Sequence, residues 1–302
     1  MKIAVIDLGT NTFHLLIVES TDNRTFTELY RERQFIQLAE NGIATIGDAP
    51  YSRALKSMTY FSEIIRQHQV TNLTALGTAA LRTASNGPQL IKEIEEKTAI
   101  PIQVITGDEE ARLICQGTRL AVPMTEQKVL IMDIGGGSVE FTIANNTQQF
   151  WAQSFPIGVS VLFNQFHKSD PISATEVDTI LQHLKKTLEP LLQQIDQHQF
   201  QALVGASGTF DVLENILVKE KLTPDYSSIK TSDLKKVVDQ WQNTTLQERL
   251  DHPDIPDTRA KLIVVAFILI QFITDLTEID NIWISRFAMK EGLIADHLKN
   301  EV

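Results

Sequence analysis

Short apolar runs bounded by polar residues open the chain, at residues 3–6 and 15–18, which is typical of buried strands. The pattern predicts a meander of three strands, with its first turn at residues 8–11. Stretches with apolar residues at helical spacing then alternate with short apolar runs, as in α/β domains. The expected elements are strands at 2–7, 12–19, 25–37, 72–77 and 102–105 and helices at 50–69, 87–98 and 108–121.

The second half of the chain opens with the same pattern of strands. Strands are expected at 129–133, 138–144, 149–154, 202–206 and 281–285, and helices at 159–167, 174–197, 209–219, 259–274 and about 290–302, with more than one helix spanning 232–250. A polar stretch, residues 123–127, separates the two halves. We therefore expect an α/β protein of two domains, residues 1–124 and 125–302, with the last helix packed back on the first domain.

Each half contains a hairpin in which a strand ends on an acid and a glycine turn follows. In the second half Asp133 ends the strand, three glycines and Ser138 follow, and Glu140 lies on the returning strand. The first half repeats the form acid, aliphatic, glycine, two residues, hydroxyl from Asp7 to Thr12. Glycine lets backbone N–H groups approach a polyanion closely. Either hairpin alone is compatible with an ordinary turn, but the repeat favours two phosphate loops facing a shared cleft.

Composition and charge limit the classes of function. The formal net charge of −11 argues against a nucleic-acid coat protein, and the apolar run at 262–273 is too short to span a bilayer. A single cysteine excludes an internal disulfide, and the first residues lack the pattern of a signal peptide. We expect a cytoplasmic protein that binds neither nucleic acid nor membranes and uses metal ions at any phosphate site.

Five stretches, in order along nearly the whole chain, resemble motifs of the exopolyphosphatase / guanosine pentaphosphate phosphohydrolase family. They are residues 7–14, 77–86, 106–112, 133–140 and 205–209. The most specific is Gly-Asp-Glu-Glu-Ala-Arg at 107–112. The family belongs to the actin, Hsp70 and sugar-kinase superfamily, so the resemblance implies two related, ribonuclease H-like domains that flank a cleft. Larger relatives carry further C-terminal helical domains, and this chain resembles the short members.

Hydrolysis of a phosphoanhydride needs an aligned water, a group that orients or deprotonates it, and positive charge on the phosphoryl oxygens. The resemblance implies that Glu110 is the catalytic base. Alternatively, Glu109 and Glu110 merely favour the positive end of a helix dipole. The carboxylates of Asp7, Asp133 and Glu140 are suited to bind Mg²⁺ or another divalent cation. Apolar and polar residues alternate along the strand of Glu140, so a solvent-exposed position is the alternative for this residue.

Phosphate contacts are expected from the two loops, from one arginine and from a third glycine turn. The candidates are Gly9, Thr10, Asn11, Thr12, Arg82, Gly135, Gly136, Gly137, Ser138, Gly205, Ser207, Gly208 and Thr209. Arg82 is chosen for its place in the motif at 77–86; a surface arginine is the alternative. The turn at 205–209 is equally compatible with tight packing.

Other reactive residues have simpler explanations. His14 has apolar neighbours and fits a half-buried structural histidine, and Cys115 fits a buried helix face. Near the end, Ser285 to Gly292 departs from the Ser-Asp-x-x-Leu-Arg-Glu-Gly form of relatives, with Lys290 in place of the arginine. A point charge does not replace a fork-shaped donor, so the arginine's role is in doubt here unless Arg286 compensates.

The main functional hypothesis is a Mg²⁺-dependent exopolyphosphatase that releases terminal orthophosphate from inorganic polyphosphate. Hydrolysis of the 5′ γ-phosphate of guanosine pentaphosphate would use the same residues. A sugar or acetate kinase would share the phosphate loops but does not predict the motif at 107–112. A regulator that binds polyphosphate or a guanosine penta/tetraphosphate without turnover is the remaining alternative. The resemblance also implies a possible homodimer.

Overall fold

The first domain is built on a five-stranded sheet. A computed structural model describes residues 1–21, 25–219, 221 and 223–299 of the chain. The sheet has the order β3-β2-β1-β4-β5, with β1, β2 and β3 antiparallel and β4 and β5 parallel to β1. Its strands are β1 (Lys2–Leu8), β2 (Thr12–Glu19), β3 (Thr27–Phe35), β4 (Asn72–Gly77) and β5 (Ile102–Val104).

The second domain repeats this topology and adds one edge strand. Its sheet has the order β10-β11-β9-β6-β7-β8, in which β6, β7 and β8 are antiparallel and β9 and β11 follow β6 in parallel. The strands are β6 (Val129–Ile134), β7 (Val139–Ala144), β8 (Gln149–Phe155), β9 (Leu203–Ala206), β10 (Tyr226–Lys230) and β11 (Asn281–Ser285). The predicted fold of two related α/β domains is confirmed.

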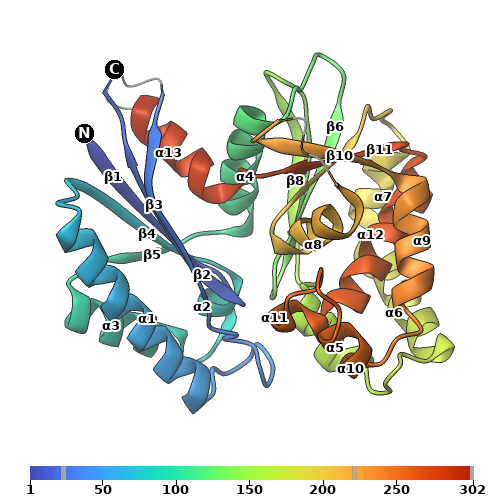
Figure 1. Cartoon of the computed structure of the whole chain (residues 1–302), viewed down its shortest axis with the longest axis horizontal. Helices are drawn as coiled ribbons and strands as arrows, with labels where there is room; N and C mark the ends of the chain where they lie inside the picture. The colour runs from blue at the N-terminus through green and yellow to red at the C-terminus, as the bar shows by residue number, and fades with distance from the viewer. Residues whose placement is uncertain (22–24, 220, 222, 300–302) are drawn as a thin grey trace.

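Helices cover both faces of the first sheet. Helices α1 (Asp48–Gln67) and α3 (Gly87–Thr98) bury one face, and the short α2 (Ala79–Thr83) follows β4. Helix α4 (Gly107–Ala121) contributes to a core that joins both sheets, and α13 (Met289–Lys299) packs through Ile294 and Leu298 on the other face of β1 and β2. Figure 1 shows α4 and α13 side by side between the sheets. Residues 300–302 of the expected last helix lie outside the described residues.

The second domain is centred on α12 (Ile263–Thr277), which is apolar on nearly all sides and mostly buried, as predicted for 259–274. Helices α5 to α11 surround it and the sheet. Their bounds are α5 (Val159–Phe166), α6 (Ala174–Thr187), α7 (Glu189–Ile195), α8 (Gly208–Leu217), α9 (Thr231–Trp241), α10 (Leu246–Leu250) and α11 (Asp257–Ala260). No described helix is long and apolar enough to cross a bilayer.

Two expectations about this domain were wrong. The single helix expected at 174–197 is broken at Leu188, because Pro190 lacks the N–H that would continue the ladder and instead opens a new helix. Strand β10 was missed because its only buried aliphatic side chain is Ile229. It pairs antiparallel with β11 and forms the edge of the sheet.

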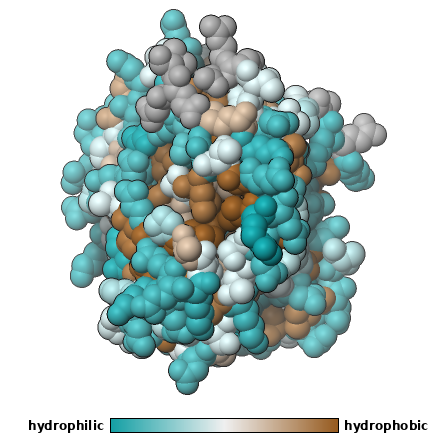
Figure 2. Space-filling model, turned by 90° about the vertical axis from the view of Figure 1, so that its left-hand side faces the viewer, coloured by the Kyte–Doolittle hydropathy of each residue, from teal (hydrophilic) through white to brown (hydrophobic). Residues whose placement is uncertain are grey.

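The surface of the first domain is not uniformly polar. Figure 2 shows apolar residues gathered near the centre of the face on the left of Figure 1, inside a rim of polar side chains. Tyr60 and Val104 are among the large apolar side chains of this domain that are exposed. Part of the apolar interior is therefore visible between its covering elements.

Candidate active site

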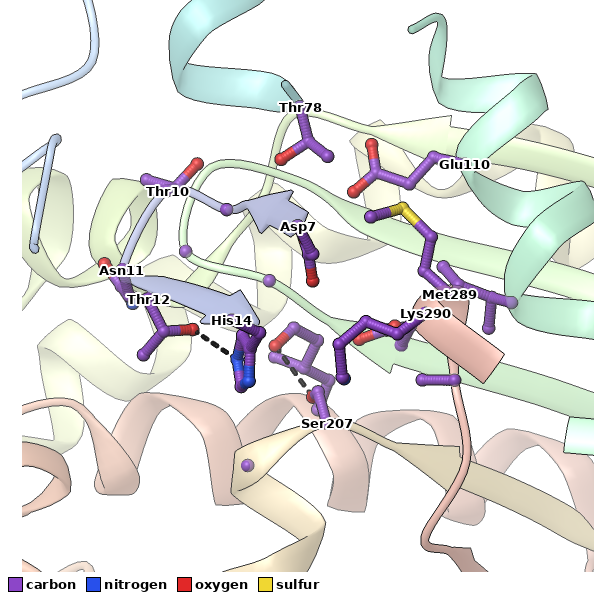
Figure 3. Close-up of a pocket in the computed structure, with 18 of the residues that line it drawn as sticks. Asp7, Thr10, Asn11, Thr12, His14, Thr78, Glu110, Ser207, Met289 and Lys290 are labelled. Carbon is purple, nitrogen blue, oxygen red and sulfur yellow. Dashed lines mark hydrogen bonds between the residues drawn. The ribbon is translucent and has the colours of Figure 1, made fainter. Parts of the chain in front are cut away.

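A cavity of about 260 Å³ lies where the two glycine hairpins meet. It is lined by Asp7, Gly9, Thr10, Asn11 and Thr12 from the first hairpin and by Asp133, Gly135, Gly136, Gly137, Ser138 and Glu140 from the second. Glu110, Ser207 and Gly208 also line it. Figure 3 shows these side chains converging from both domains. The structure thus brings the two predicted phosphate loops and the predicted carboxylates to one site.

The first hairpin turns its carbonyl groups away from the cavity. The Gly9 N–H donates to the Thr12 carbonyl at 3.0 Å and closes the turn. The carbonyls of Thr10 and Asn11 accept N–H groups from residues 36–38, just beyond β3. Because these acceptors are occupied elsewhere, the N–H groups of residues 10–12 are left for an anion.

The second hairpin is closed in the same way. The Gly135 N–H donates to the Ser138 carbonyl at 3.0 Å, and a Cβ on Gly135 would lie 2.9 Å from that carbonyl. Carbonyls of the three glycines accept N–H groups from residues 158–160, just beyond β8. The segments after the third strand of each domain therefore hold the two loops in matching fashion.

The two loops touch across the domain boundary. A Cβ on Gly136 would lie 2.6 Å from the Asn11 carboxamide, and one on Gly137 would lie 2.8 Å from the Thr10 hydroxyl. The Ser160 hydroxyl donates to the Asn11 side-chain oxygen at 2.8 Å. Glycine is needed at 136 and 137 because no side chain fits between the loops.

Glu110 reaches the cavity from the first turn of α4. Thr106 caps the helix by accepting the Glu109 N–H at 3.2 Å, and Gly107 allows the helix start to lie against Ser154 on β8. Glu109 turns away and forms a two-pronged pair with Arg112 at 2.8 and 2.7 Å. The two acids therefore have different environments: Glu109 is part of a surface ion pair and Glu110 is buried in the cavity wall.

The carboxyl groups that line the cavity are buried close to one another, which disfavours their ionised forms. Burial raises the pKa of Asp7 to about 7, of Asp133 to about 6 and of Glu140 to about 7. Burial, and then the Glu140 carboxylate, raise the pKa of Glu110 well above its usual range. In the described part of the chain, the Glu110 Oε2 atom has no hydrogen-bond partner. It forms a long ion pair of 3.6 Å with the Arg82 guanidinium.

A cation at this site would relieve that repulsion. Among the described residues, no three His, Cys, Asp or Glu side chains stand close enough to form a complete metal site. Mg²⁺, however, is held by one or two carboxylates together with waters and substrate phosphates. Asp7, Asp133 and Glu140 beside the two loops fit that mode of binding.

A model of the Ppx/GppA phosphatase family matches residues 16–301. The chain belongs to the Ppx/GppA phosphatase family. It is 29% identical over 293 residues to a guanosine-5'-triphosphate,3'-diphosphate pyrophosphatase of Aliivibrio fischeri strain MJ11, which aligns 96% of this chain with 58% of that protein. The chain thus spans less than two thirds of the length of such relatives. The resemblance found in the sequence is confirmed.

Solved Ppx/GppA structures extend the comparison. The fold is similar to the crystal structure of an exopolyphosphatase from Cytophaga hutchinsonii, with 36% identity, a TM-score of 0.95 and coverage of 99% of this chain and 98% of that one. It is also similar to the Aquifex aeolicus family member, with 21% identity, a TM-score of 0.82 and coverage of 100% and 98%. The second match shows the shared Ppx/GppA fold.

Other predicted site residues lie around rather than in this Ppx/GppA cavity. Arg82 donates to the Ile105 carbonyl at 2.6 Å and lines a neighbouring cavity that shares Gly137 and Ser138 with the first. Among the described residues, the main cavity is lined by Ser207 and Gly208 but not by Gly205 or Thr209. A Cβ on Gly205 would lie 2.1 Å from the Phe210 ring, so this glycine is required by packing.

His14 lines the cavity, which the sequence did not indicate. Its Nε2 atom lies 2.9 Å from the Thr12 hydroxyl. Burial, followed by the charge of Lys290, holds the pKa of His14 well below its ordinary value, so the ring is neutral. Cys115 is fully buried in the apolar core, as its helix position indicated.

Sequence reasoning missed part of the basic side of the cavity, which is lined by Arg31, Arg33, Arg259, Arg286 and Lys290. Arg286 and Lys290 lie in the divergent segment at 285–292 noted in the sequence. Arg31 and Arg33 were missed, although they occupy alternate positions of β3, a spacing that places them on one face of a strand and offered a usable signal. Arg259 comes from a distant segment that carries no motif. The Ppx/GppA site therefore has an acidic side facing a basic one.

Arg259 is fixed in the wall by packing and by a polar network. A Cβ on Gly208 would lie 2.1 Å from its guanidinium, which also stands 5.7 Å from the centre of the Phe35 ring. Burial, and then the neighbouring Arg33, lower the pKa of Arg259 to about 10. The charged form of Arg259 is therefore destabilised by burial, and an anion bound next to it would stabilise it.

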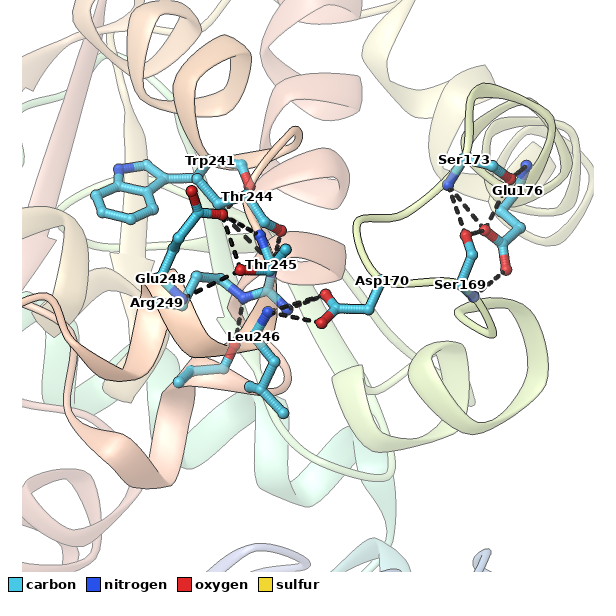
Figure 4. Close-up of polar contacts among 11 residues, drawn as sticks. Ser169, Asp170, Ser173, Glu176, Trp241, Thr244, Thr245, Leu246, Glu248 and Arg249 are labelled. Carbon is cyan, nitrogen blue, oxygen red and sulfur yellow. Dashed lines mark hydrogen bonds and ion pairs between the residues drawn. The ribbon is translucent and has the colours of Figure 1, made fainter.

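The helix that carries Arg259 is anchored by a buried arginine. The Arg249 Nε atom donates to the Ala260 carbonyl at 2.9 Å, and its Nη2 atom lies 3.4 Å from Asp170. Asp170 in turn accepts the Leu246 N–H at 2.9 and 2.8 Å (Figure 4). This network joins the loop before α6 to α10 and α11 and so keeps Arg259 at the cavity.

Proposed function

We propose that this protein is a Mg²⁺-dependent exopolyphosphatase that hydrolyses the terminal phosphoanhydride of inorganic polyphosphate. The observation that carries the proposal is the placement of Glu110, whose buried carboxylate faces the space between two phosphate loops. The similarity at 36% identity to a structure named as an exopolyphosphatase, over nearly the full length of both chains, supports the choice of substrate.

The loops and the cation would hold the terminal phosphoryl group. Backbone N–H groups of residues 10–12 and 136–138 bind its oxygens from both sides. Asp7, Asp133 and Glu140 would hold Mg²⁺, which offsets the charge of the phosphates when it is bound. A chain of phosphates needs no apolar pocket, which agrees with a cavity lined mostly by polar and charged residues.

Glu110 would orient and deprotonate the attacking water. Burial, and then the carboxylates of Glu140 and Asp7, raise the pKa of Glu110 well above its usual value, which favours its protonated form. Positive charge next to Glu140 and Asp7 would offset the part of this rise in pKa that comes from their carboxylates, and Arg82 acts in the same direction. A cation bound there would therefore favour the ionised form of Glu110, which can act as a base.

The test compares Glu110→Gln with the wild-type protein. We expect turnover to fall by ~10²–10⁴ while polyphosphate binding is retained, because the amide keeps the shape but accepts no proton. Phosphate release from polyphosphates of defined length, with binding measured by calorimetry, gives both quantities. Glu109→Gln is the matched control, since Glu109 is paired with Arg112 outside the cavity. Equal turnover in Glu110→Gln and wild type would refute the role of Glu110.

Guanosine pentaphosphate is the second candidate substrate, favoured by the similarity to the pyrophosphatase of Aliivibrio fischeri. The same release assay on guanosine pentaphosphate separates the two substrates by their kcat/KM values. A wild-type protein that binds both compounds but releases phosphate from neither would instead be a regulator of the kind considered above.

A further inference from the structure

Lys290 is a buried cation at the centre of the cavity. Only 8% of the residue is exposed, and it lies on the second position of α13, where the positive end of the helix dipole adds to its charge. Its ammonium acts electrostatically on Asp7, Asp133 and His14, which belong to both hairpins. Figure 3 shows the side chain entering the cavity below Asp7, with Glu110 on the opposite side of that residue in this view.

The Lys290 ammonium forms no ion pair with any described residue. Its charge nevertheless lowers the pKa values of Asp7, Asp133 and Glu291. Among the described residues, the Lys290 Nζ atom is not one of the fully buried polar atoms that lack a partner, so it keeps access to the cavity that Lys290 lines. An anion held between the loops would provide a partner for this charge.

The structure fixes the backbone of Lys290 from two directions. The Glu291 carboxylate accepts the Ala288 N–H at 2.9 Å and the Arg31 guanidinium at 2.9 Å, which ties the first turn of α13 to β3. Glu291 is fully buried, and although burial alone would raise its pKa, Lys290 and Arg31 lower it below the usual value. The carboxylate is therefore charged and holds the helix start in place.

Helices α13 and α4 also meet backbone to backbone. A Cβ on Gly117 would lie 1.8 Å from the Ala288 carbonyl, and one on Gly292 would lie 1.9 Å from the Leu113 carbonyl. Two glycines at the crossing set the spacing of the helices with no intervening side chain. Because Glu110 opens α4 and Lys290 opens α13, this contact fixes the two residues relative to each other at the cavity.

We propose that Lys290 is a catalytic residue that binds the oxygens of the terminal phosphoryl group and stabilises their charge as the phosphoanhydride breaks. The proposal rests on the function proposed above. Its position near both loops suits a group that contacts the transferred phosphoryl, and its ammonium can donate three hydrogen bonds. A role limited to balancing the charge of the buried acids is the competing explanation.

The test measures kcat at saturating Mg²⁺ for Lys290→Met, Lys290→Gln and Lys290→Arg, with Lys236→Met at an exposed position of α9 as control. We expect kcat to fall by ~10²–10³ in the first two variants, with partial recovery in Lys290→Arg and no change in the control. Affinity for orthovanadate and orthophosphate, measured by calorimetry with Mg²⁺, should weaken by a similar factor.

A kcat and vanadate affinity within about threefold of wild type for Lys290→Met and Lys290→Gln would overturn the proposal. That result would leave charge balance as the only role of Lys290, and thermal unfolding without Mg²⁺ would then show the variants altered. The affinity for orthophosphate requires no turnover. If the wild-type protein hydrolyses no phosphoanhydride, the proposed function fails, while the phosphate affinities still decide whether Lys290 binds phosphoryl oxygens.

Discussion

The two glycine hairpins have the same backbone arrangement but present different side chains to the cavity. In both, a glycine N–H closes the turn at 3.0 Å, and the hydroxyl that ends the loop bonds the side chain two residues later. The register is also shared, since Asp7 pairs with His14 and Asp133 pairs with Glu140. At the matching position the first hairpin therefore carries a neutral imidazole and the second carries a carboxylate.

The third strands of the two domains also differ in the side chains that they bring to the hairpins. Beside the first hairpin, β3 supplies Arg31 and Arg33, whereas beside the second, β8 supplies Ser154, whose hydroxyl donates to Glu140 at 2.7 Å. The repeated backbone provides two anion-binding loops, and a few side chains then separate a basic side from an acidic one. In this fold, loop geometry and charge are specified by different residues.

Within the two hairpins, the largest effect is expected from replacing each of the two matching residues, Glu140 and His14, with glutamine. Glu140→Gln should lower turnover by ~10²–10³, because it removes a negative charge next to the expected cation. His14→Gln should lower it by about tenfold or less, because the ring is already neutral. Phosphate release at saturating Mg²⁺ measures both. Equal losses in the two variants would contradict the division of roles between the hairpins.

A smaller effect is expected where the loops touch. Gly136→Ala places a methyl group 2.6 Å from the Asn11 carboxamide, so the second loop must move away from the first. Since the phosphoryl group is held between them, we expect kcat/KM to fall by about 10–10². Gly47→Ala, where the nearest atom is 3.7 Å away, is the control. Unchanged kinetics in Gly136→Ala would mean that the loops need not be in contact during turnover.

The smallest effect concerns stability and pH. The pKa of Glu140 is raised to about 7, so its contribution to stability is present below the unfolded value of 4.5 and is lost as the pH rises through 7. The pKa of His14 is lowered well below 6.5, so its contribution is lost as the pH falls below 6.5. Thermal unfolding of the metal-free protein should thus show opposite changes in Glu140→Gln and His14→Gln.

Glu140→Gln should remove part of the loss of stability at alkaline pH, and His14→Gln should remove part of the loss of stability at acid pH. Added Mg²⁺ should raise the unfolding temperature of the wild-type protein more at pH 8 than at about pH 5.5, because metal competes with protons for the carboxylates. An equal effect of Mg²⁺ at both pH values would indicate that the cation binds elsewhere.

The hairpins could be predicted because each is encoded locally. A strand, an acid, glycines and a hydroxyl within a dozen residues fix both the turn and its chemistry, and a repeat in the same order predicts the paired domains. The catalytic role of Glu110, the metal role of the acids and the boundary near residue 124 stay predictions. What the structure adds is their common location.

The basic side of the cavity could not be predicted in the same way. Arg33, Arg259 and Lys290 come from β3, α11 and α13, and only the folded chain brings them together. The side chains of Arg33 and Arg259 are held by contacts with a glycine, an aromatic ring and a distant carboxylate, none of which is visible in a short window of sequence. The helix break at Leu188 is different, because Pro190 is enough to predict it from the sequence.

The return of α13 to the first domain has a consequence for biosynthesis. Ile3, Val5, Leu16 and Val18 are covered by Ile294 and Leu298, from the other end of the described chain. A ribosome that has translated only the first domain has therefore made a sheet with one apolar face uncovered. Contacts of such sequence separation form late and slowly. We expect the nascent first domain to attract chaperones until synthesis reaches residue 298, when the same helix delivers Lys290 and completes the site.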